Sequence, residues 1–263
     1  MDLRLDGKRA LVTGSTAGIG FAIAEGLARE GAVVVVNGRT ERRVAEAADA
    51  IVRETGGTAT GITADLGTAK GVDALLDQAG RIDILVNNVG IFEPVEFSNI
   101  SDEAWQTIFD VNVMSGVRLS RALVPGMVER GWGRIVFISS ESGVQIPAEM
   151  VHYGVTKTAQ LALSRGIAES VAGTGVTSNA VLPGPTRSDG VVDFVEKLAS
   201  EQKADKETFE RDFVKTMRPS SLIGRFAETE EVANLVVFLC GEGSSAITGA
   251  SLRVDGGVVR SIV

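Results

Sequence analysis

The sequence contains one cysteine, Cys240, and one histidine, His152, among its 263 residues. A single cysteine excludes an internal disulfide framework. Because the chain also has only one histidine, a metal centre ligated by Cys and His is not expected either, and no metal is expected. The sequence has no run of about 18 apolar residues, so no transmembrane helix is expected. Residues 1–7 also lack the apolar run of a secretory signal. We therefore expect a cytoplasmic protein without a membrane anchor.

Basic residues are fewer than acidic ones, 26 against 34, and the formal net charge is −8. An acidic protein is repelled by phosphate backbones, so nucleic-acid binding is not expected. Hydrophobic residues make up 44% and charged residues 23% of the chain. That composition supplies enough apolar material for a sizeable core and is too apolar for a disordered chain.

Seven short runs rich in valine and isoleucine are typical of strands buried on both faces of a parallel sheet. They are residues 9–12, 32–36, 59–63, 82–86, 134–138, 176–182 and 251–254. Between them, apolar residues recur three and four apart, the pattern of amphipathic helices, at 19–30, 42–54, 70–78 and 150–171. This alternation predicts an α/β, Rossmann-like, doubly wound fold with a seven-stranded parallel sheet. Because no Pro/Gly/Ser linker divides the chain, we expect one domain over residues 1–263.

Two segments depart from this rhythm. Residues 101–130 predict one extended helix that starts at Ser101, a residue suited to a helix N-terminus. Residues 184–225 are longer than an ordinary connection and are highly charged between 196 and 218, with interleaved phenylalanines. They predict one or two amphipathic helices that form a lid over the substrate, because insertions of this length in compact domains are usually functional. The alternative is a charged excursion into solvent.

The glycine-rich loop Thr13–Gly20 follows the first expected strand and opens the first expected helix. Glycines allow a sharp turn and a close approach of the backbone to a pyrophosphate. The helix N-terminus then offers free N–H groups and the positive end of its dipole to the anion. A glycine triplet is weak evidence alone, but its place at the first strand–helix junction predicts a dinucleotide site.

The end of the second expected strand reports on the cofactor ribose. An NAD site places an acidic residue there for the 2′-hydroxyl, whereas this chain has Gly38 followed by Arg39. An arginine can form forked hydrogen bonds to a 2′-phosphate, with Arg42 or Arg43 assisting. We therefore expect NADP(H), with NAD as the alternative; Arg39 would then be only a surface residue.

Several motifs in this order and spacing resemble the short-chain dehydrogenase/reductase family over nearly the whole chain. The loop has the form T-G-x-x-x-G-x-G, and Tyr153 and Lys157 form a Y-x-x-x-K pair thirteen residues after Ser140. The other matching motifs are Asp65-Leu66, Asn87-Asn88-Val89-Gly90 in place of N-N-A-G, Val111-Asn112-Val113, Pro183-Gly184-Pro185-Thr186 and Asp255-Gly256-Gly257.

The resemblance implies both a catalytic set and a cofactor-binding set. The implied catalytic residues are Asn112, Ser140, Tyr153 and Lys157. The implied cofactor contacts are Gly14, Ser15, Thr16, Gly18, Ile19, Gly20, Arg39, Asp65, Leu66, Asn88, Tyr153, Lys157, Pro183, Gly184 and Thr186. Ser139 competes with Ser140, since only a residue on the pocket side of the strand end reaches the substrate; the family spacing selects Ser140, and Ser142 is a further neighbour.

Hydride transfer to a carbonyl leaves charge on oxygen, which calls for a proton donor beside it. Tyr153 is the only tyrosine, and an ordinary phenol has a pKa near 10. Lys157 lies one helical turn further along, and we expect its ammonium to lower that pKa. The resemblance further implies that Lys157 binds the nicotinamide ribose, that Ser140 polarises the substrate oxygen, and that Asn112 tethers a water linking Lys157 to solvent.

The residues expected around the pocket are mostly apolar and favour a moderately hydrophobic carbonyl compound. They are Phe92, Pro94, Val144, Gln145, Ile146 and Val151. Arg187 could meet an anionic substrate group, the cofactor phosphates or an acidic neighbour. His152 points about 100° away from Tyr153 on a helix, so we interpret it as pocket wall or interface. Cys240, inside an apolar run, reads as a buried small hydrophobe.

The leading hypothesis is an oxidoreductase that transfers a hydride between NADP(H) and a small-molecule carbonyl or secondary alcohol, with Tyr153 as acid and base. One alternative is a 3-oxoacyl-thioester reductase, which shares the machinery and differs in its partner. Another is a dinucleotide-sensing binding protein without chemistry. The family resemblance also implies a homo-oligomer, usually a tetramer.

Overall fold

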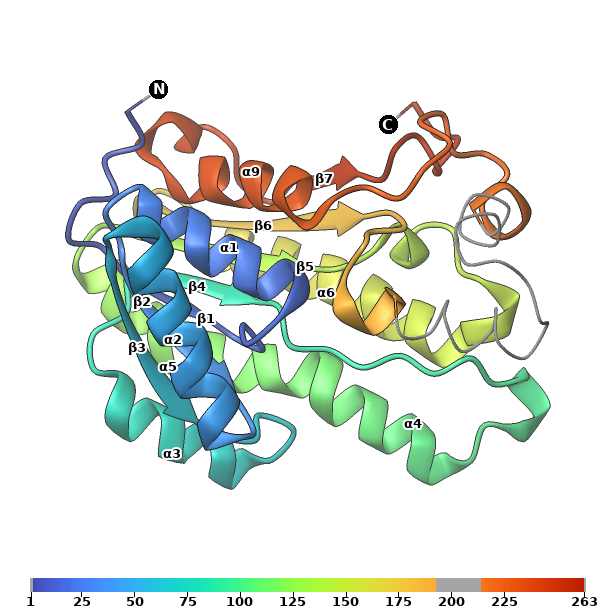
Figure 1. Cartoon of the computed structure of the whole chain (residues 1–263), viewed down its shortest axis with the longest axis horizontal. Helices are drawn as coiled ribbons and strands as arrows, with labels where there is room; N and C mark the ends of the chain where they lie inside the picture. Colours follow the sequence, from blue (N-terminus) through green and yellow to red (C-terminus); the bar gives the residue numbers. More distant parts are fainter. Residues whose placement is uncertain (1, 193–213, 263) are drawn as a thin grey trace.

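The computed structural model describes residues 2–192 and 214–262 and contains one seven-stranded parallel sheet (Figure 1). Its strand order is β3-β2-β1-β4-β5-β6-β7. The strands are β1 (Arg9–Val12), β2 (Val33–Gly38), β3 (Thr58–Thr63), β4 (Ile84–Asn87), β5 (Gly133–Ile138), β6 (Val176–Pro183) and β7 (Ser251–Val254). All seven predicted strands are present, with ends that differ by one or two residues, and the predicted fold class is confirmed.

Helices cover both faces of this sheet, as a doubly wound fold requires. The helices are α1 (Gly18–Arg29), α2 (Glu41–Thr55), α3 (Ala69–Ala79), α4 (Asp102–Phe109), α5 (Ser115–Glu129), α6 (Val151–Ser170) and α9 (Thr229–Cys240). Local signals set several of their ends. Gly56 ends α2 with a left-handed φ of 69°, and the Thr68 hydroxyl caps α3 by accepting from Gly71 N at 3.0 Å.

The extended helix predicted over residues 101–130 is one helical run with a widened turn in its middle. The Ser101 hydroxyl caps α4 by accepting from Ala104 N at 3.1 Å. A π turn, Asp110–Met114, then joins α4 to α5. Such insertions are rare and frequently occur at functional sites. The sequence pattern did not predict this turn, which contains Asn112.

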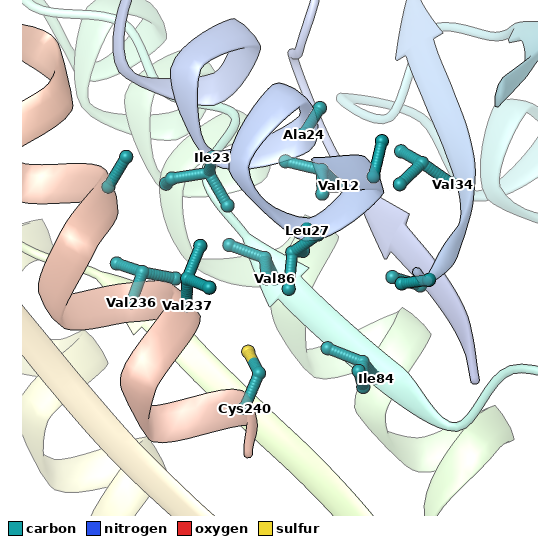
Figure 2. Close-up of a cluster of buried hydrophobic side chains, with 14 of the residues drawn as sticks. Val12, Ile23, Ala24, Leu27, Val34, Ile84, Val86, Val236, Val237 and Cys240 are labelled. Atoms are coloured by element: carbon teal, nitrogen blue, oxygen red, sulfur yellow. The ribbon is translucent and has the colours of Figure 1, made fainter. Parts of the chain in front are cut away.

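Two apolar cores lie on opposite faces of the sheet because successive strand residues point to opposite faces. Val12 faces α1, α2 and α9, whereas Leu11 faces α3, α5 and α6. Figure 2 shows the first core, in which Ile23 and Leu27 from α1 meet Val236 and Cys240 from α9 above β1 and β4. Cys240 is fully buried, and burial raises the pKa of its thiol to about 12, so the prediction of a small buried hydrophobe is confirmed.

Strands β1 and β4 are neighbours in the sheet. From this pair the chain adds β2 and β3 on one side and β5, β6 and β7 on the other, so the strand order changes direction between them. In open α/β sheets, ligands bind outside the carboxyl ends of the strands at such a switch point. The expected lid over 184–225 is described only at its ends, where residues 189–192 and 214–217 are helical; residues 193–213 lie outside the described part. Within the described ranges, none of the helices combines the length and apolar character needed to cross a membrane.

Candidate active site

The glycine loop forms an open cradle at the N-terminus of α1. Ala17, the residue before α1, has an extended backbone and makes no side-chain cap, so the first N–H groups of the helix face outward. Gly14 has a left-handed φ of 60°, and a Cβ at Gly20 would lie 2.6 Å from Gly14 O. A hollow of about 260 Å³ adjoins this turn. The loop therefore requires glycine and leaves room for an anion at the helix end.

The amide side chains of Asn37 in β2 and Asn88 just after β4 hold this loop in shape. Asn88 Nδ2 donates to Thr13 O at 2.9 Å and to Gly14 O at 3.1 Å. Asn37 Oδ1 accepts from Gly14 N at 3.3 Å, and Asn37 Nδ2 donates to carbonyls at the end of β3. Ser15 is fully buried and donates to Val12 O, so it belongs to the scaffold of the loop. The sequence reasoning missed Asn37, whose only signal was a polar residue in an otherwise apolar strand.

The residues at the expected ribose site include an exposed arginine and a glycine packed against Thr16. Arg39 is exposed, and no hydrogen bond or ion pair engages it within residues 2–192 and 214–262. Arg42 is held by Glu46 at 2.9 Å. A Cβ at Gly38 would lie 2.6 Å from Thr16 Cγ2, so a larger residue at position 38 would require the Thr16 side chain to move. Asp65 is exposed after β3 and accepts from Gly67 N, while Leu66 beside it is buried.

A cavity of about 760 Å³ lies at the carboxyl ends of β4, β5 and β6. Ile19, Asn88, Gly90 and Ser188 line both this cavity and the smaller hollow at α1, so the two form one continuous crevice. The predicted site residues that line the cavity are Ile19, Asn88, Ser140, Tyr153, Lys157, Pro183, Gly184 and Thr186. The structure thus brings the expected phosphate loop and the expected reacting residues to a single crevice.

Ser140 and Ser139 end β5 with different hydrogen-bond partners. The Ser139 hydroxyl donates to the main-chain oxygen of Lys157 at 2.8 Å and is used to dock α6. The Ser140 hydroxyl donates to Glu141 Oε2 at 2.5 Å and accepts from Ser142 N at 3.1 Å. Glu141 is buried and lines the cavity, yet the sequence reasoning did not single it out. The Ser140 hydroxyl, one of the cavity walls, is therefore paired with a carboxylate.

Tyr153 and Lys157 lie one turn apart on α6 and both face the cavity. Lys157 Nζ donates to Ile138 O at 2.9 Å and lies 5.5 Å from the centre of the Tyr153 ring. Burial lowers the pKa of the Lys157 ammonium to about 8, with Glu141 opposing the change.

The pKa of the Tyr153 phenol is raised rather than lowered, so the expected depression by Lys157 is wrong for this arrangement. Burial is the largest cause, and the Glu141 carboxylate adds to it. A hydrogen bond with Ser140 and the charge of Arg218 oppose the rise. Desolvation of the phenolate outweighs these favourable charges.

Asn112 lies in the π turn and is almost fully buried. Its Oδ1 accepts from Ile91 N at 2.8 Å, while its Nδ2 donates to Ile91 O at 2.9 Å and to the Thr156 hydroxyl at 3.1 Å. A Cβ at Gly90 would lie 3.4 Å from Asn112 Oδ1 and 3.6 Å from Lys157 Nζ. Glycine at position 90 therefore leaves a gap between these two groups.

The pocket walls agree only in part with the sequence expectations. Phe92 and Pro94 line the cavity, but Val144, Gln145, Ile146 and Val151 are not among its lining residues. Val144 and Ile146 are 47% and 46% exposed. The residues that the sequence reasoning missed include Ile91, Glu141, Glu149, Met150, Arg218 and Phe226. After β5 the chain turns into a short 3₁₀ helix at Glu141–Gly143, and this turn determines which of the following side chains face the cavity. The local amino-acid composition does not predict that orientation.

Two residues left open by the sequence have neighbours in the structure. Arg187 Nε lies 3.3 Å from Glu228 Oε1, so an acidic neighbour is one of its partners. His152 is buried, and its ring packs edge-on against Trp105 with centroids 5.8 Å apart. Burial lowers the pKa of His152. Among the described residues, no group of three His, Cys, Asp or Glu side chains is arranged to hold a metal ion.

Comparisons with known proteins agree with this geometry over the whole chain. The family model described as enoyl-(acyl carrier protein) reductase matches residues 14–259. The uncharacterized oxidoreductase YvaG of Bacillus subtilis is 47% identical, with both chains covered completely. The 3-oxoacyl-[acyl-carrier-protein] reductase FabG of Aquifex aeolicus is 34% identical, over 98% of this chain and 100% of the relative.

A solved structure of L-sorbose reductase from Gluconobacter frateurii, complexed with NADPH and L-sorbose, superposes with a TM-score of 0.94 at 35% identity, covering 100% of both chains. The chain therefore belongs to the short-chain dehydrogenase/reductase family of oxidoreductases.

Proposed function

We propose that the protein interconverts a small-molecule ketone and the corresponding secondary alcohol, with Tyr153 as the proton donor and acceptor. The observation that carries this proposal is the convergence of Ser140, Tyr153 and Lys157 on one wall of a 760 Å³ cavity that continues into the cradle at α1. A dinucleotide lying along this crevice would reach from the glycine loop to Tyr153. The part of the site that would hold the cofactor phosphates and the part that holds Tyr153 therefore belong to the same crevice.

In the reduction, bound NADPH would supply a hydride to the carbonyl carbon. The electron pair of the C=O double bond then moves to oxygen, which takes the proton of the Tyr153 hydroxyl. The Ser140 hydroxyl contacts the same oxygen as a preorganised donor. The alcohol leaves, and the proton returns to Tyr153 from solvent. In the oxidation, each step runs in reverse.

Lys157 makes this proton transfer feasible despite the raised pKa of Tyr153. Its ammonium is buried 5.5 Å from the centre of the phenol ring, so it can return a proton to the phenolate without lowering the pKa of the phenol. A lysine pKa lowered to about 8 also makes the ammonium a better proton source near neutral pH. Asn112 supports this route, because its Oδ1 and Lys157 Nζ border the same gap beside Gly90. We infer a water chain from this gap to solvent.

The experiment follows NADPH oxidation at 340 nm with a panel of neutral ketones, anionic keto acids and acyl thioesters. We expect turnover of at least one ketone, and we expect Tyr153→Phe to abolish most of it while NADPH binding persists. Tight NADPH binding without turnover on the whole panel would instead support a dinucleotide-sensing protein. Retention of most activity by Tyr153→Phe would refute the assigned role of the phenol.

A second candidate is a 3-oxoacyl-thioester reductase, supported by the relatives of that activity at 34% identity over the full length. The apolar side chains Phe92, Met150 and Phe226 on the cavity wall suit an acyl chain. Reduction of acetoacetyl thioesters with a higher kcat/KM than neutral ketones would favour this candidate.

We also propose that the protein acts in the cytoplasm as a homotetramer of single-domain subunits. The family resemblance supports the tetramer, and a single buried cysteine is compatible with a reducing compartment. Light scattering coupled to size-exclusion chromatography measures the subunit number, and a monomer at micromolar concentration would contradict the proposal.

A further inference from the structure

A buried carboxylate stands directly beside the reacting serine. Glu141 follows Ser140 in the chain, its side chain is only 6% exposed, and it lines the cavity. Glu141 Oε2 accepts the hydrogen bond of the Ser140 hydroxyl at 2.5 Å. A serine hydroxyl has one proton, so this contact uses the proton that the substrate oxygen would need.

Arg218 fixes the other oxygen of the same carboxylate. Its Nε lies 2.9 Å from Glu141 Oε1, and its Nη1 lies 3.4 Å from Glu149 Oε1. Arg218 is 77 residues away in the sequence and is itself largely buried, with 15% of its side chain exposed. The guanidinium thus anchors Glu141 from the opposite wall and leaves Oε2 directed at Ser140.

Stability alone does not account for a charge pair at this place. Removing two charges from water costs several kcal/mol, and apolar residues of similar volume are often equally or more stable. The pair also faces a cavity in which a substrate would bind. A carboxylate kept beside the reacting carbonyl is better explained by a hydrogen-bond donor on the substrate.

The donor that fits is a hydroxyl group on the carbon next to the carbonyl. In such a molecule the two oxygens lie within hydrogen-bonding distance of each other, as do Ser140 Oγ and Glu141 Oε2. The substrate hydroxyl would donate to Glu141 and replace Ser140 there, and the Ser140 proton would then be free for the carbonyl oxygen. A ketone without this hydroxyl has to compete with Glu141 for the same proton. An anionic group at this carbon would meet a second negative charge.

We propose that Glu141, anchored by Arg218, is a specificity-determining residue that selects neutral α-hydroxy ketones, and vicinal diols in the reverse direction. This proposal rests on the carbonyl reduction proposed above and adds the substrate class. A hydrogen bond to a carboxylate discriminates against an analogue that lacks the donor, so we expect the hydroxylated compound to be preferred by about 10- to 100-fold in kcat/KM.

The experiment compares 1-hydroxy-2-butanone with 2-butanone, two ketones with the same carbon skeleton, as NADPH-dependent substrates. Wild type should prefer the hydroxylated ketone by at least about 10-fold. Glu141→Gln keeps the shape of the side chain and removes its charge, and it should reduce this preference at least about fivefold. The matched control is Glu149→Gln, which removes the other acid from Arg218 without touching Ser140 and should retain the preference.

Glu141→Ala provides a second variant that removes the acceptor completely, and circular dichroism confirms that each variant is folded. A wild-type preference below twofold, or an unchanged preference in both Glu141 variants, would overturn the proposal while carbonyl reduction stands. Loss of the preference in Glu149→Gln to the same extent would also overturn it, because the effect would then belong to the charge of the cavity as a whole. Absence of turnover with every carbonyl compound would refute the proposed function itself.

Discussion

The buried ammonium group of Lys157 should reduce the stability of the fold, because a charge is costly to remove from water. Burial lowers its pKa from 10.5 to about 8, and only 4% of the residue is exposed. That difference corresponds to about 3 kcal/mol of cost for carrying the charge in the folded state. The hydrogen bond from Nζ to Ile138 O returns about 1 to 2 kcal/mol of this cost. Replacement by methionine, which is similar in length and uncharged, should therefore stabilise the protein by about 1 to 2 kcal/mol at pH 7.

The gain should depend on pH with a definite sign. Below pH 8, Lys157 is protonated in both the folded and the unfolded chain, so the wild type carries the full cost. Between pH 8 and 10.5, the unfolded chain binds a proton that the folded chain has lost, and the wild type gains stability relative to Lys157→Met as the pH rises. Since the wild type gains about 1.4 kcal/mol per pH unit above pH 8, the stability difference should vanish between about pH 8.7 and pH 9.5 and reverse at higher pH.

Urea unfolding of wild type and Lys157→Met at pH 7 and pH 9.5 measures this difference. Lys70→Met, at an exposed position on α3, is the control and should change the stability by less than about 0.5 kcal/mol at both pH values. If Lys157→Met were less stable than wild type at pH 7, or if its gain did not fall with pH, the claim that burial of the ammonium strains the fold would be refuted.

Three further predictions concern activity. Tyr153→Phe should lower kcat by about 10²- to 10⁴-fold with unchanged NADPH affinity, which steady-state kinetics and fluorescence titration test together. Arg39→Ala should raise the KM for NADPH by about 10- to 100-fold and leave that for NADH nearly unchanged, because a forked contact to the 2′-phosphate is lost; equal effects on both cofactors would contradict this. Alcohol oxidation requires the Tyr153 phenolate, whose pKa is raised by burial first and by Glu141 second, so its rate should increase with pH through neutrality. Glu141→Gln removes the second cause and should move this pH profile to lower pH; a shift to higher pH would show that the carboxylate acts differently.

The sequence was sufficient to predict the strands and to name several of the residues that line the cavity. The central strands β1, β2, β4, β5 and β6 were recognisable because burial on both faces of the sheet leaves short apolar runs in the sequence, whereas the edge strands β3 and β7 are largely exposed or half-buried. Tyr153 and Lys157 were singled out by their resemblance to the Y-x-x-x-K motif of the family, together with the glycine loop, since a spacing of one helical turn is common by itself. Properties that depend on neighbours within a few residues can be inferred from order and spacing alone.

The tertiary structure decided the electrostatics and the walls of the pocket. The contact between Glu141 and Arg218 joins residues 77 positions apart, and no local pattern encodes it. The pKa of Tyr153 is raised rather than lowered because desolvation and a buried carboxylate act on it together. Val144 and Ile146 were expected in the pocket, but they are not among the residues that line the cavity. The burial of a side chain, and the electrostatic effect of the charges around it, depend on every segment that packs against it. Both can therefore be known only once the complete fold is known.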